Sequence, residues 1–186
     1  TLDGVMQAPS IPEEDLSGGF QQGGWAAPYW DQVMEQVGRE AMTAPYDLLL
    51  GRRTYDLFAA HFAERHDGDP ASARLNNAVK HVATRSRTRL GWNNSRALRG
   101  DIVAHVTRLK ATPGPLLQVH GSQALIQCLL AHDLIDEFRL WTFPVAVGTG
   151  KRLFSAAAPM PALRLVKSGR TPGGVSMTFY RRQRAA

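Results

Sequence analysis

Short apolar segments alternate with helical segments through the middle of this 186-residue chain, and this alternation limits the possible folds more than any other feature. Residues 46–50 and 116–120 are apolar runs that end at Gly51 and Gly121, and residues 79–84 alternate in period two, as buried strands do. Helical spacing of apolar residues follows the strands. Because a helix between two buried strands must cross over the sheet, the pattern predicts a largely parallel sheet covered on both faces.

The helical segments are recognised by apolar residues on one face. They are expected over residues 28–43, 52–63, 71–77, 102–111 and 122–132. Asp101 stands directly before the fourth of them, where its carboxylate can cap the first turn. Residues 86–100 are polar and predict irregular structure.

The two ends of the chain differ in character. The C-terminal part predicts a strand over 136–144 and an antiparallel hairpin of strands 163–169 and 174–181. Residues 1–28 are rich in Gly, Pro and Gln and predict a long loop, whose aromatic residues argue against a disordered arm. We therefore expect a single α/β domain over 1–186, with a mostly parallel sheet and a C-terminal antiparallel hairpin.

Charge is divided unevenly along the chain. Residues 1–70 hold 12 acidic and 4 basic residues, whereas residues 71–186 hold 4 acidic and 18 basic ones, which gives a net charge of +6. Excess positive charge indicates a partner with phosphate groups: nucleic acid, an anionic membrane or a phosphorylated small molecule.

Composition excludes several classes of protein. The chain is 44% apolar and 20% charged, which argues against intrinsic disorder. A single cysteine, Cys128, excludes an internal disulfide framework and fits a reducing compartment. Apolar runs stay well below the ~20 residues of a membrane helix, and no secretory signal opens the chain. We therefore expect a cytoplasmic protein without a membrane partner.

Familiar catalytic motifs do not match. Gly148-Thr149-Gly150-Lys151 resembles part of a phosphate loop, but Val145 stands where its first glycine belongs, and Leu153 breaks the dinucleotide fingerprint. The six histidines lack metal-ligand spacing, and one cysteine cannot build a thiolate zinc site. We therefore expect no bound metal.

The junction after the first strand combines Gly51, two arginines, Arg52 and Arg53, and Thr54 at the start of a helix. The first amide groups of a helix lack intrahelical partners and carry positive potential, so added guanidinium groups make an anion site. A helix start with solvated arginines is the alternative, but basic residues in a first turn oppose the helix dipole.

Two further junctions repeat this chemistry. Gly121 and Ser122 open the helix after the strand 116–120, where a simple helix cap is the alternative. Thr84, Arg85 and Ser86 follow the strand 79–84. Carboxyl ends of parallel strands share one edge of the sheet, where ligands of such folds bind, so three junctions predict one phosphate-binding edge.

At this point the sequence resembles a known family. The segments that carry the resemblance are Leu2-Asp3-Gly4, Gly51-Arg52-Arg53-Thr54-Tyr55, Val119-His120-Gly121-Ser122 and the run from Phe143 to Phe154. They are similar to the dihydrofolate-reductase-like superfamily, and most of all to the reductase domain of riboflavin biosynthesis and its stand-alone bacterial relatives.

The resemblance implies a three-layer α/β/α fold, NADPH as cofactor, a homodimer, and reduction of a small pyrimidine- or pterin-like substrate. It places Asp3 and Phe143 beside the nicotinamide and the substrate. We further expect Asp3 or Asp31 to anchor a polar group of the substrate or to help deliver a proton. Trp25 and Trp30 are expected to line the substrate site, with packing of the long loop onto the core as their alternative role. The residues that it assigns to the cofactor are Gly51, Arg52, Arg53, Thr54, Thr84, Arg85, Ser86, Gly121, Ser122, Gln123, Ala124 and Leu125.

Three departures narrow this expectation. Dihydrofolate reductases carry an acid shortly after a Trp-x-x-Pro motif, but here Trp30 takes that position and Asp31 comes one residue late, which argues against folate. The single cysteine excludes the zinc deaminase half of the bifunctional riboflavin enzyme. The family has a strand before Leu2-Asp3-Gly4, so we expect that strand to be missing or truncated in a sequence that starts at Thr1.

Two other functions stay open. The sequence pI near 10.0 and the arginines at 85, 87, 89, 181, 182 and 184 fit nucleic-acid binding, but the aromatic residues lie mostly elsewhere, so we expect no nucleic-acid partner. A non-catalytic, dimeric ligand-binding relative is the other alternative, because Trp30 and not an acid stands at the position expected for the catalytic acid.

Overall fold

The structure is a computed structural model that describes residues 1–33, 44–64, 70–154 and 162–183. The helix expected over 28–43 therefore lies largely outside the described residues. The chain forms two compact units, one of residues 1–36 and 129–186 and one of residues 37–128. Each unit is described by itself below.

The unit of residues 37–128 contains a four-stranded sheet in the order β3-β2-β1-β4. All three strand pairs are parallel, as predicted. The strands are β1 (Tyr46–Gly51), β2 (Lys80–Ala83), β3 (Ser95–Leu98) and β4 (Leu116–Gln118). The sequence missed β3 because this four-residue edge strand is partly exposed and lacks an apolar run, so only its pairing with β2 reveals it.

The helices of this unit agree closely with the sequence pattern. They are α2 (Arg52–Phe62), α3 (Pro70–Asn77), α4 (Ile102–Ala111) and α5 (Gln123–Ala131), which continues into the other unit. The Asp101 carboxylate accepts a hydrogen bond of 3.0 Å from the Ala104 amide, so the predicted cap of α4 is confirmed.

A hydrophobic cluster of this unit packs on one face of the parallel sheet. Alternate residues of β1, namely Tyr46, Leu48 and Leu50, pack with Tyr55 of α2 and with Trp92. The Trp92 amide donates a hydrogen bond of 2.8 Å to the Tyr55 hydroxyl oxygen. Because α2 is anchored to β1 in this way, its first turn is held next to the strand end that precedes it.

Lys80 is an exception among these apolar residues, because its side chain is fully buried. Its ammonium group donates to the carbonyl oxygens of Asn76 (2.6 Å) and Asn93 (3.0 Å) and lies 4.3 Å from the centre of the Trp92 ring. Burial lowers the pKa of Lys80 to about 8.

This lowered pKa predicts a pH-dependent stability. Below pH 8 both the folded and the unfolded chain hold the Lys80 proton, whereas from about pH 8 to 10.5 only the unfolded chain does, so folding becomes more favourable as the pH rises. In urea titrations, the free energy of unfolding of the wild type relative to Lys80→Met should increase by about 1–3 kcal/mol over this range. A difference that does not change with pH would contradict the prediction.

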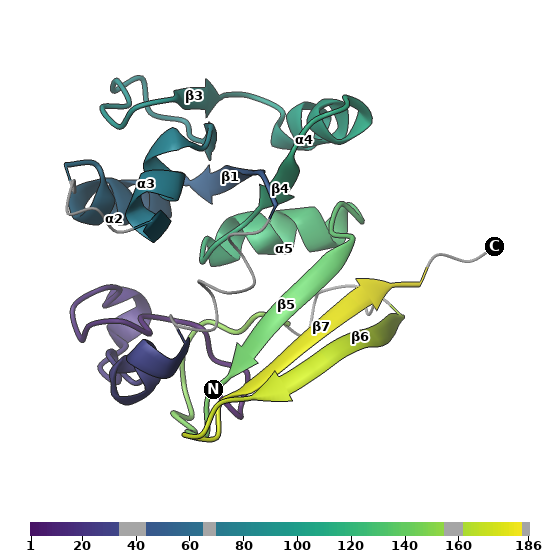
Figure 1. The fold of residues 1–186 in the computed structure, drawn as a ribbon. Coiled ribbons are helices and arrows are strands. Elements are labelled where there is room, and N and C mark those ends of the chain that lie inside the picture. Colours follow the sequence, from purple (N-terminus) through teal and green to yellow (C-terminus); the bar gives the residue numbers. More distant parts are fainter. Residues whose placement is uncertain (34–43, 65–69, 155–161, 184–186) are drawn as a thin grey trace. The chain divides into compact units, whose positions relative to one another are not determined.

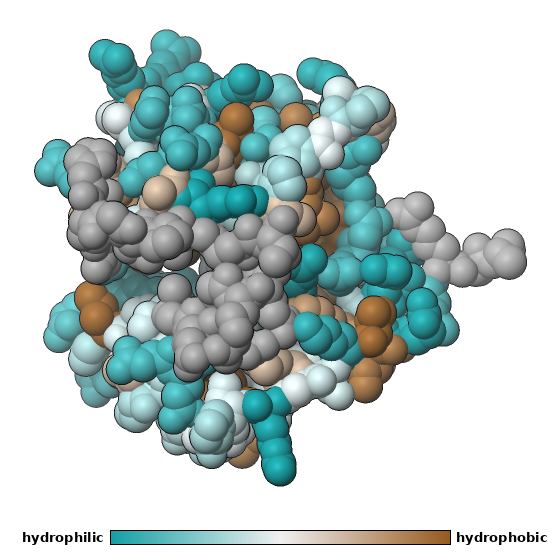
Figure 2. Space-filling view, in the orientation of Figure 1, coloured by the Kyte–Doolittle hydropathy of each residue, from teal (hydrophilic) through white to brown (hydrophobic). Residues whose placement is uncertain are grey.

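The other unit contains a three-stranded antiparallel sheet in the order β5-β7-β6, whose strands lie side by side in Figure 1. The strands are β5 (Glu137–Thr142), β6 (Leu163–Arg170) and β7 (Ser176–Arg182). The predicted hairpin of β6 and β7 is confirmed, and β5 adds a third strand to it. Figure 2 shows a small hydrophobic patch among hydrophilic residues over this hairpin, where Leu165 and Val166 are about half exposed.

The loop over residues 1–28 packs onto this unit and contains two short 3-10 turns, η1 (Ser17–Gly19) and η2 (Ala27–Tyr29). Val5 forms an antiparallel bridge with Arg152, and Val5, Ala8 and Phe20 form a small buried cluster. Among the described residues, no helix is long and apolar enough to cross a membrane.

Candidate functional site

The first and second glycine junctions meet at one edge of the parallel sheet. They follow β1 and β4, which are neighbours, as the sequence analysis predicted. The Gly51 amide donates a hydrogen bond of 2.9 Å to the Ser122 hydroxyl oxygen, and the Ser122 amide donates one of 3.1 Å to the Thr54 hydroxyl oxygen. Tertiary contacts therefore bring Gly51, Thr54, Gly121 and Ser122 together.

Arg52, in the first turn of α2, forms an ion pair with Asp56. Its Nε lies 2.9 Å from each carboxylate oxygen of Asp56, one helical turn further on. Its Nη1 is buried and has no hydrogen-bond partner among the residues that the structure describes. A buried guanidinium nitrogen without an acceptor favours an anion at this helix start.

Apart from the Asp56 carboxylate one turn further on, nothing in the first turn of α2 offsets this positive charge. Gly51 has no side chain to cap the first turn, and the turn contains no acidic residue. Arg53 is exposed on the same turn. Asp56 is the residue that the sequence analysis missed, and its spacing of four from Arg52 on a helix is the signal that could have identified it.

The third junction follows β2, on the other side of β1. Thr84 is buried and its hydroxyl oxygen accepts a hydrogen bond of 3.0 Å from the Ser86 amide, while Arg85 is exposed. The Arg99 Nε donates to the Ser86 carbonyl oxygen over 3.2 Å. The carboxyl ends of three adjacent strands therefore carry the predicted polar residues.

The remaining expected cofactor residues form the first turn of α5. Gln123 is partly buried, Ala124 is exposed, and the Leu125 side chain belongs to the core. Leu125 can therefore contribute to a ligand site only through its backbone.

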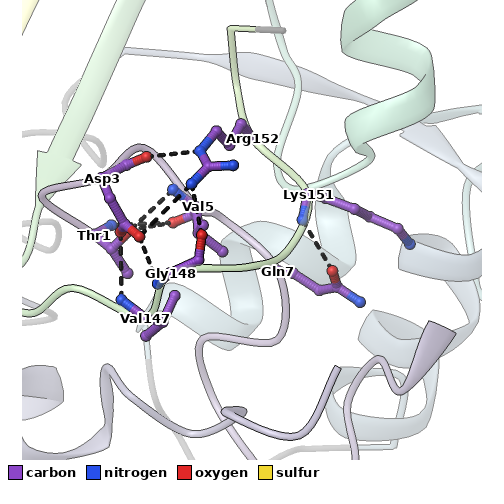
Figure 3. Close-up of polar contacts among 8 residues, drawn as sticks. All are labelled: Thr1, Asp3, Val5, Gln7, Val147, Gly148, Lys151 and Arg152. Atoms are coloured by element: carbon purple, nitrogen blue, oxygen red, sulfur yellow. Dashed lines mark hydrogen bonds and ion pairs between the residues drawn. The ribbon is translucent and has the colours of Figure 1, made fainter. Parts of the chain in front are cut away.

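Asp3, in the other unit, is surrounded by hydrogen-bond donors (Figure 3). Its carboxylate accepts from the Thr1 hydroxyl (2.5 Å) and from the Gly148 (2.7 Å) and Val147 (3.4 Å) amides, and it lies 3.8 Å from the Arg152 guanidinium group. These hydrogen bonds, of which that from Thr1 is the strongest, lower the pKa of Asp3 to about 2 despite some desolvation. At neutral pH this group is an ionised carboxylate that is hydrogen-bonded to the loop around Gly148.

The Gly148-Thr149-Gly150-Lys151 segment has a structural function in this unit. The Lys151 amide donates to the Gln7 side-chain oxygen over 3.0 Å, as Figure 3 shows, and its ammonium group lies 2.6 Å from the Asp15 carboxylate. Burial by itself would raise the pKa of Asp15, but hydrogen bonds from Lys151 and Ser17 lower this pKa to about 2. The lysine therefore holds the N-terminal loop in place.

The expected substrate residues are divided between a cluster and the surface. Trp25 and Tyr29 pack edge-on against the buried Phe143 ring, with centroids 5.2 and 5.8 Å away. Trp30 and Asp31 are exposed on a helical turn that begins at Trp30. The structure thus brings Trp25 and Phe143 together and leaves the Asp31 carboxylate at the surface.

Two observations bear on the other functions considered. The first concerns nucleic-acid binding. The charged groups of Arg139 and Lys167 lie 5.5 and 5.4 Å from the centre of the Phe179 ring of β7. The antiparallel sheet therefore has an aromatic ring next to two cations, an arrangement that could not be seen in the sequence.

The second concerns metal binding. Within the described part of the chain, no group of three or more His, Cys, Asp or Glu residues could hold a metal ion.

Fold and site together define a class of protein: a mixed α/β protein with glycine, hydroxyl and guanidinium groups at the carboxyl ends of its parallel strands. The family model of the RibD C-terminal domain matches residues 1–177, so the chain belongs to that family. An uncharacterised protein of Bacillus subtilis (strain 168), YyaP, is 28% identical over 136 residues, which is 72% of each chain.

Solved structures with the same fold confirm the expected fold class. A protein from Shewanella sp. PV-4 that is named for riboflavin biosynthesis has a TM-score of 0.62 and 23% identity, over 79% of this chain and 80% of that one. The dihydrofolate reductase of Enterococcus faecalis in complex with NADP(H) has a TM-score of 0.57 and 10% identity, over 82% and 83%. A pyrimidine reductase-like protein of Corynebacterium diphtheriae has a TM-score of 0.55 and 12% identity, over 86% and 85%.

Proposed function

We propose that this protein is an NADPH-dependent reductase of a small pyrimidine- or pterin-like heterocycle. The observation that carries the proposal is the edge of the parallel sheet, where two glycine junctions and two hydroxyl groups meet. Arg52 follows the first junction, and its buried Nη1 has no hydrogen-bond partner within the described part of the chain. Membership of the RibD C-terminal domain family and the reductase fold of the structural neighbours support it.

The residues at this edge fit the phosphates of a dinucleotide. Arg52 and the backbone amides at the start of α2 would bind the diphosphate, because both supply donors and positive potential. Arg85 and Ser86, exposed or partly exposed after β2, would bind the 2′-phosphate that distinguishes NADPH from NADH. The bound cofactor would supply the hydride, and the protein would supply orientation and electrostatics.

On the substrate side we propose different functions for the two candidate acids. Asp3 keeps the 145–152 loop in place, since its carboxylate is already occupied by amide and hydroxyl donors. Asp31 is exposed and is therefore the carboxylate that can anchor a polar group of the substrate or assist proton delivery. The rings of Trp25 and Phe143 would exclude water from the reacting groups.

A binding titration tests the proposal. NADPH should quench or enhance the protein's near-ultraviolet fluorescence at micromolar concentrations, and NADH should bind about tenfold or more weakly, because the 2′-phosphate adds charge-assisted hydrogen bonds. Arg85→Ala should remove most of this preference, whereas Arg108→Ala, which removes an exposed arginine of α4, should not.

The outcomes separate the alternatives. Absence of NADPH binding by the wild type would overturn the proposal. Binding without oxidation of NADPH in the presence of pterin, pyrimidine or quinone-like substrates would identify a non-catalytic ligand-binding relative. The homodimer and the cytoplasmic location remain predictions.

A further inference from the structure

Two hydroxyl groups connect the two glycine junctions in a reciprocal way. The Thr54 hydroxyl oxygen accepts from the Ser122 amide, 68 residues away in sequence, and the Ser122 hydroxyl oxygen accepts from the Gly51 amide, 71 residues away. Each junction therefore receives a hydrogen bond from the backbone of the other, and β1 and β4 are joined beyond their last ladder contacts.

The turn that these bonds hold has an unusual backbone. Gly121 and Ser122 both have positive φ angles, 56° and 54°. Such a conformation suits glycine but costs free energy for serine, so it persists only when the surroundings enforce it. The two hydrogen bonds of Ser122, one through its amide and one through its hydroxyl oxygen, supply that enforcement.

Packing restricts the same turn from the other side. A Cβ atom at Gly121 would lie 3.3 Å from the Thr54 Cγ2 atom and 3.5 Å from its hydroxyl oxygen. The Thr54 side chain therefore lies directly against the turn with both its methyl and its hydroxyl group. If Thr54 acted only within α2, its side chain would not need to contact the Gly121–Ser122 turn.

We propose that Thr54 and Ser122 are positioning residues that lock the Gly121–Ser122 turn against the start of α2, and so preset the spacing of the two junctions for a diphosphate. The inference rests on the proposed function, because it assigns these junctions to the cofactor phosphates. Since each hydroxyl oxygen accepts from an amide, its own O–H is polarised as a donor, which suits a phosphate oxygen and disfavours a ligand that must donate.

Matched variants of Thr54 test the lock. Thr54→Val keeps the shape but removes the acceptor, whereas Thr54→Ser keeps the acceptor. In the cofactor-free protein, Thr54→Val should accelerate hydrogen exchange of the Ser122 amide about tenfold or more, and Thr54→Ser should leave it near the wild-type rate. Ser122→Ala should accelerate exchange of the Gly51 amide in the same way. Thr107→Val, on the exposed face of α4, is the control that should change neither amide.

Cofactor binding supplies the second readout. Thr54→Val and Ser122→Ala should each weaken NADPH binding about tenfold, Thr54→Ser should restore it, and the double variant should be weakened by much less than a hundredfold because both changes break one lock. Unchanged exchange of the Ser122 amide in a folded Thr54→Val protein would overturn the lock. Faster exchange with unchanged NADPH affinity would overturn the positioning role of the lock. A loss of affinity in the double variant that equals the product of the losses in the two single variants would overturn it as well. If the wild type fails to bind NADPH, the proposed function falls, and the exchange data still decide whether the lock exists.

Discussion

Replacing Arg52 with methionine should weaken NADPH binding about 10- to 100-fold while leaving the fold intact. The side chain begins at the first turn of α2, and its Nη1 is buried without a hydrogen-bond partner among the described residues. A charge-assisted hydrogen bond to a phosphate is worth about 1.5–3 kcal/mol, and methionine retains the aliphatic packing but no donor. Fluorescence titration or calorimetry measures the change in affinity, and the effect should diminish at high salt.

Two control variants separate the guanidinium group from general charge. Arg52→Lys keeps the charge but loses the planar fork, so its affinity should lie between wild type and Arg52→Met. Asp56→Asn removes only the carboxylate that orients Arg52 and should weaken binding a few-fold. If Arg52→Met binds NADPH as tightly as the wild type, the start of α2 is not the diphosphate site.

Gly150→Ala should lower the free energy of unfolding by about 3–5 kcal/mol, a large effect for a single methyl group. Gly150 has a φ angle of 130°, and a Cβ atom there would lie 2.7 Å from a methyl carbon of Val5 and 2.9 Å from the Phe20 ring. Both neighbours are buried in the cluster that holds the N-terminal loop, so neither can move away cheaply.

Gly148→Ala is the matched control two residues away. Its φ angle is 81°, but a Cβ atom there would meet nothing within 4 Å, so only the backbone cost of about 1 kcal/mol remains. Urea unfolding measures both variants. Val5→Ala in the Gly150→Ala background should recover part of the loss, because it removes the closest atom. Equal destabilisation by the two glycine variants would show that packing at residue 150 contributes nothing.

Much of the local structure follows from the order of residues alone. The Asp101 cap of α4, the helix after Gly51 and the turn between β6 and β7 depend on neighbours within a few residues, and all three agree with expectation. The meeting of the first two junctions was also predictable, because parallel strands place their carboxyl ends at the same edge. The edge strand β3 was missed because pairing with β2, and not its own composition, makes it a strand.

The chemistry of individual side chains could not be predicted in this way. Asp3 is one of two predicted catalytic acids. The Gly148 amide that binds its carboxylate is 145 residues away, and such donors determine whether a carboxylate holds a proton. Lys80 likewise stands in an ordinary alternating strand, and only the surrounding carbonyl groups and the Trp92 ring explain why a buried ammonium group is tolerated.

The sequence by itself determined the mixed α/β class, the succession of strands and helices, and the positions where glycine, hydroxyl and guanidinium groups follow a strand. These depend on periodicity and on backbone rules that act over a few residues. Only the tertiary structure decided that Thr54 and Ser122 hold each other's junction and that the Asp3 carboxylate binds the Gly148 amide. It also decided that Arg52 has a buried nitrogen with no acceptor among the residues that the structure describes. Those properties depend on burial and on donors distant in sequence, which act only when the chain has folded.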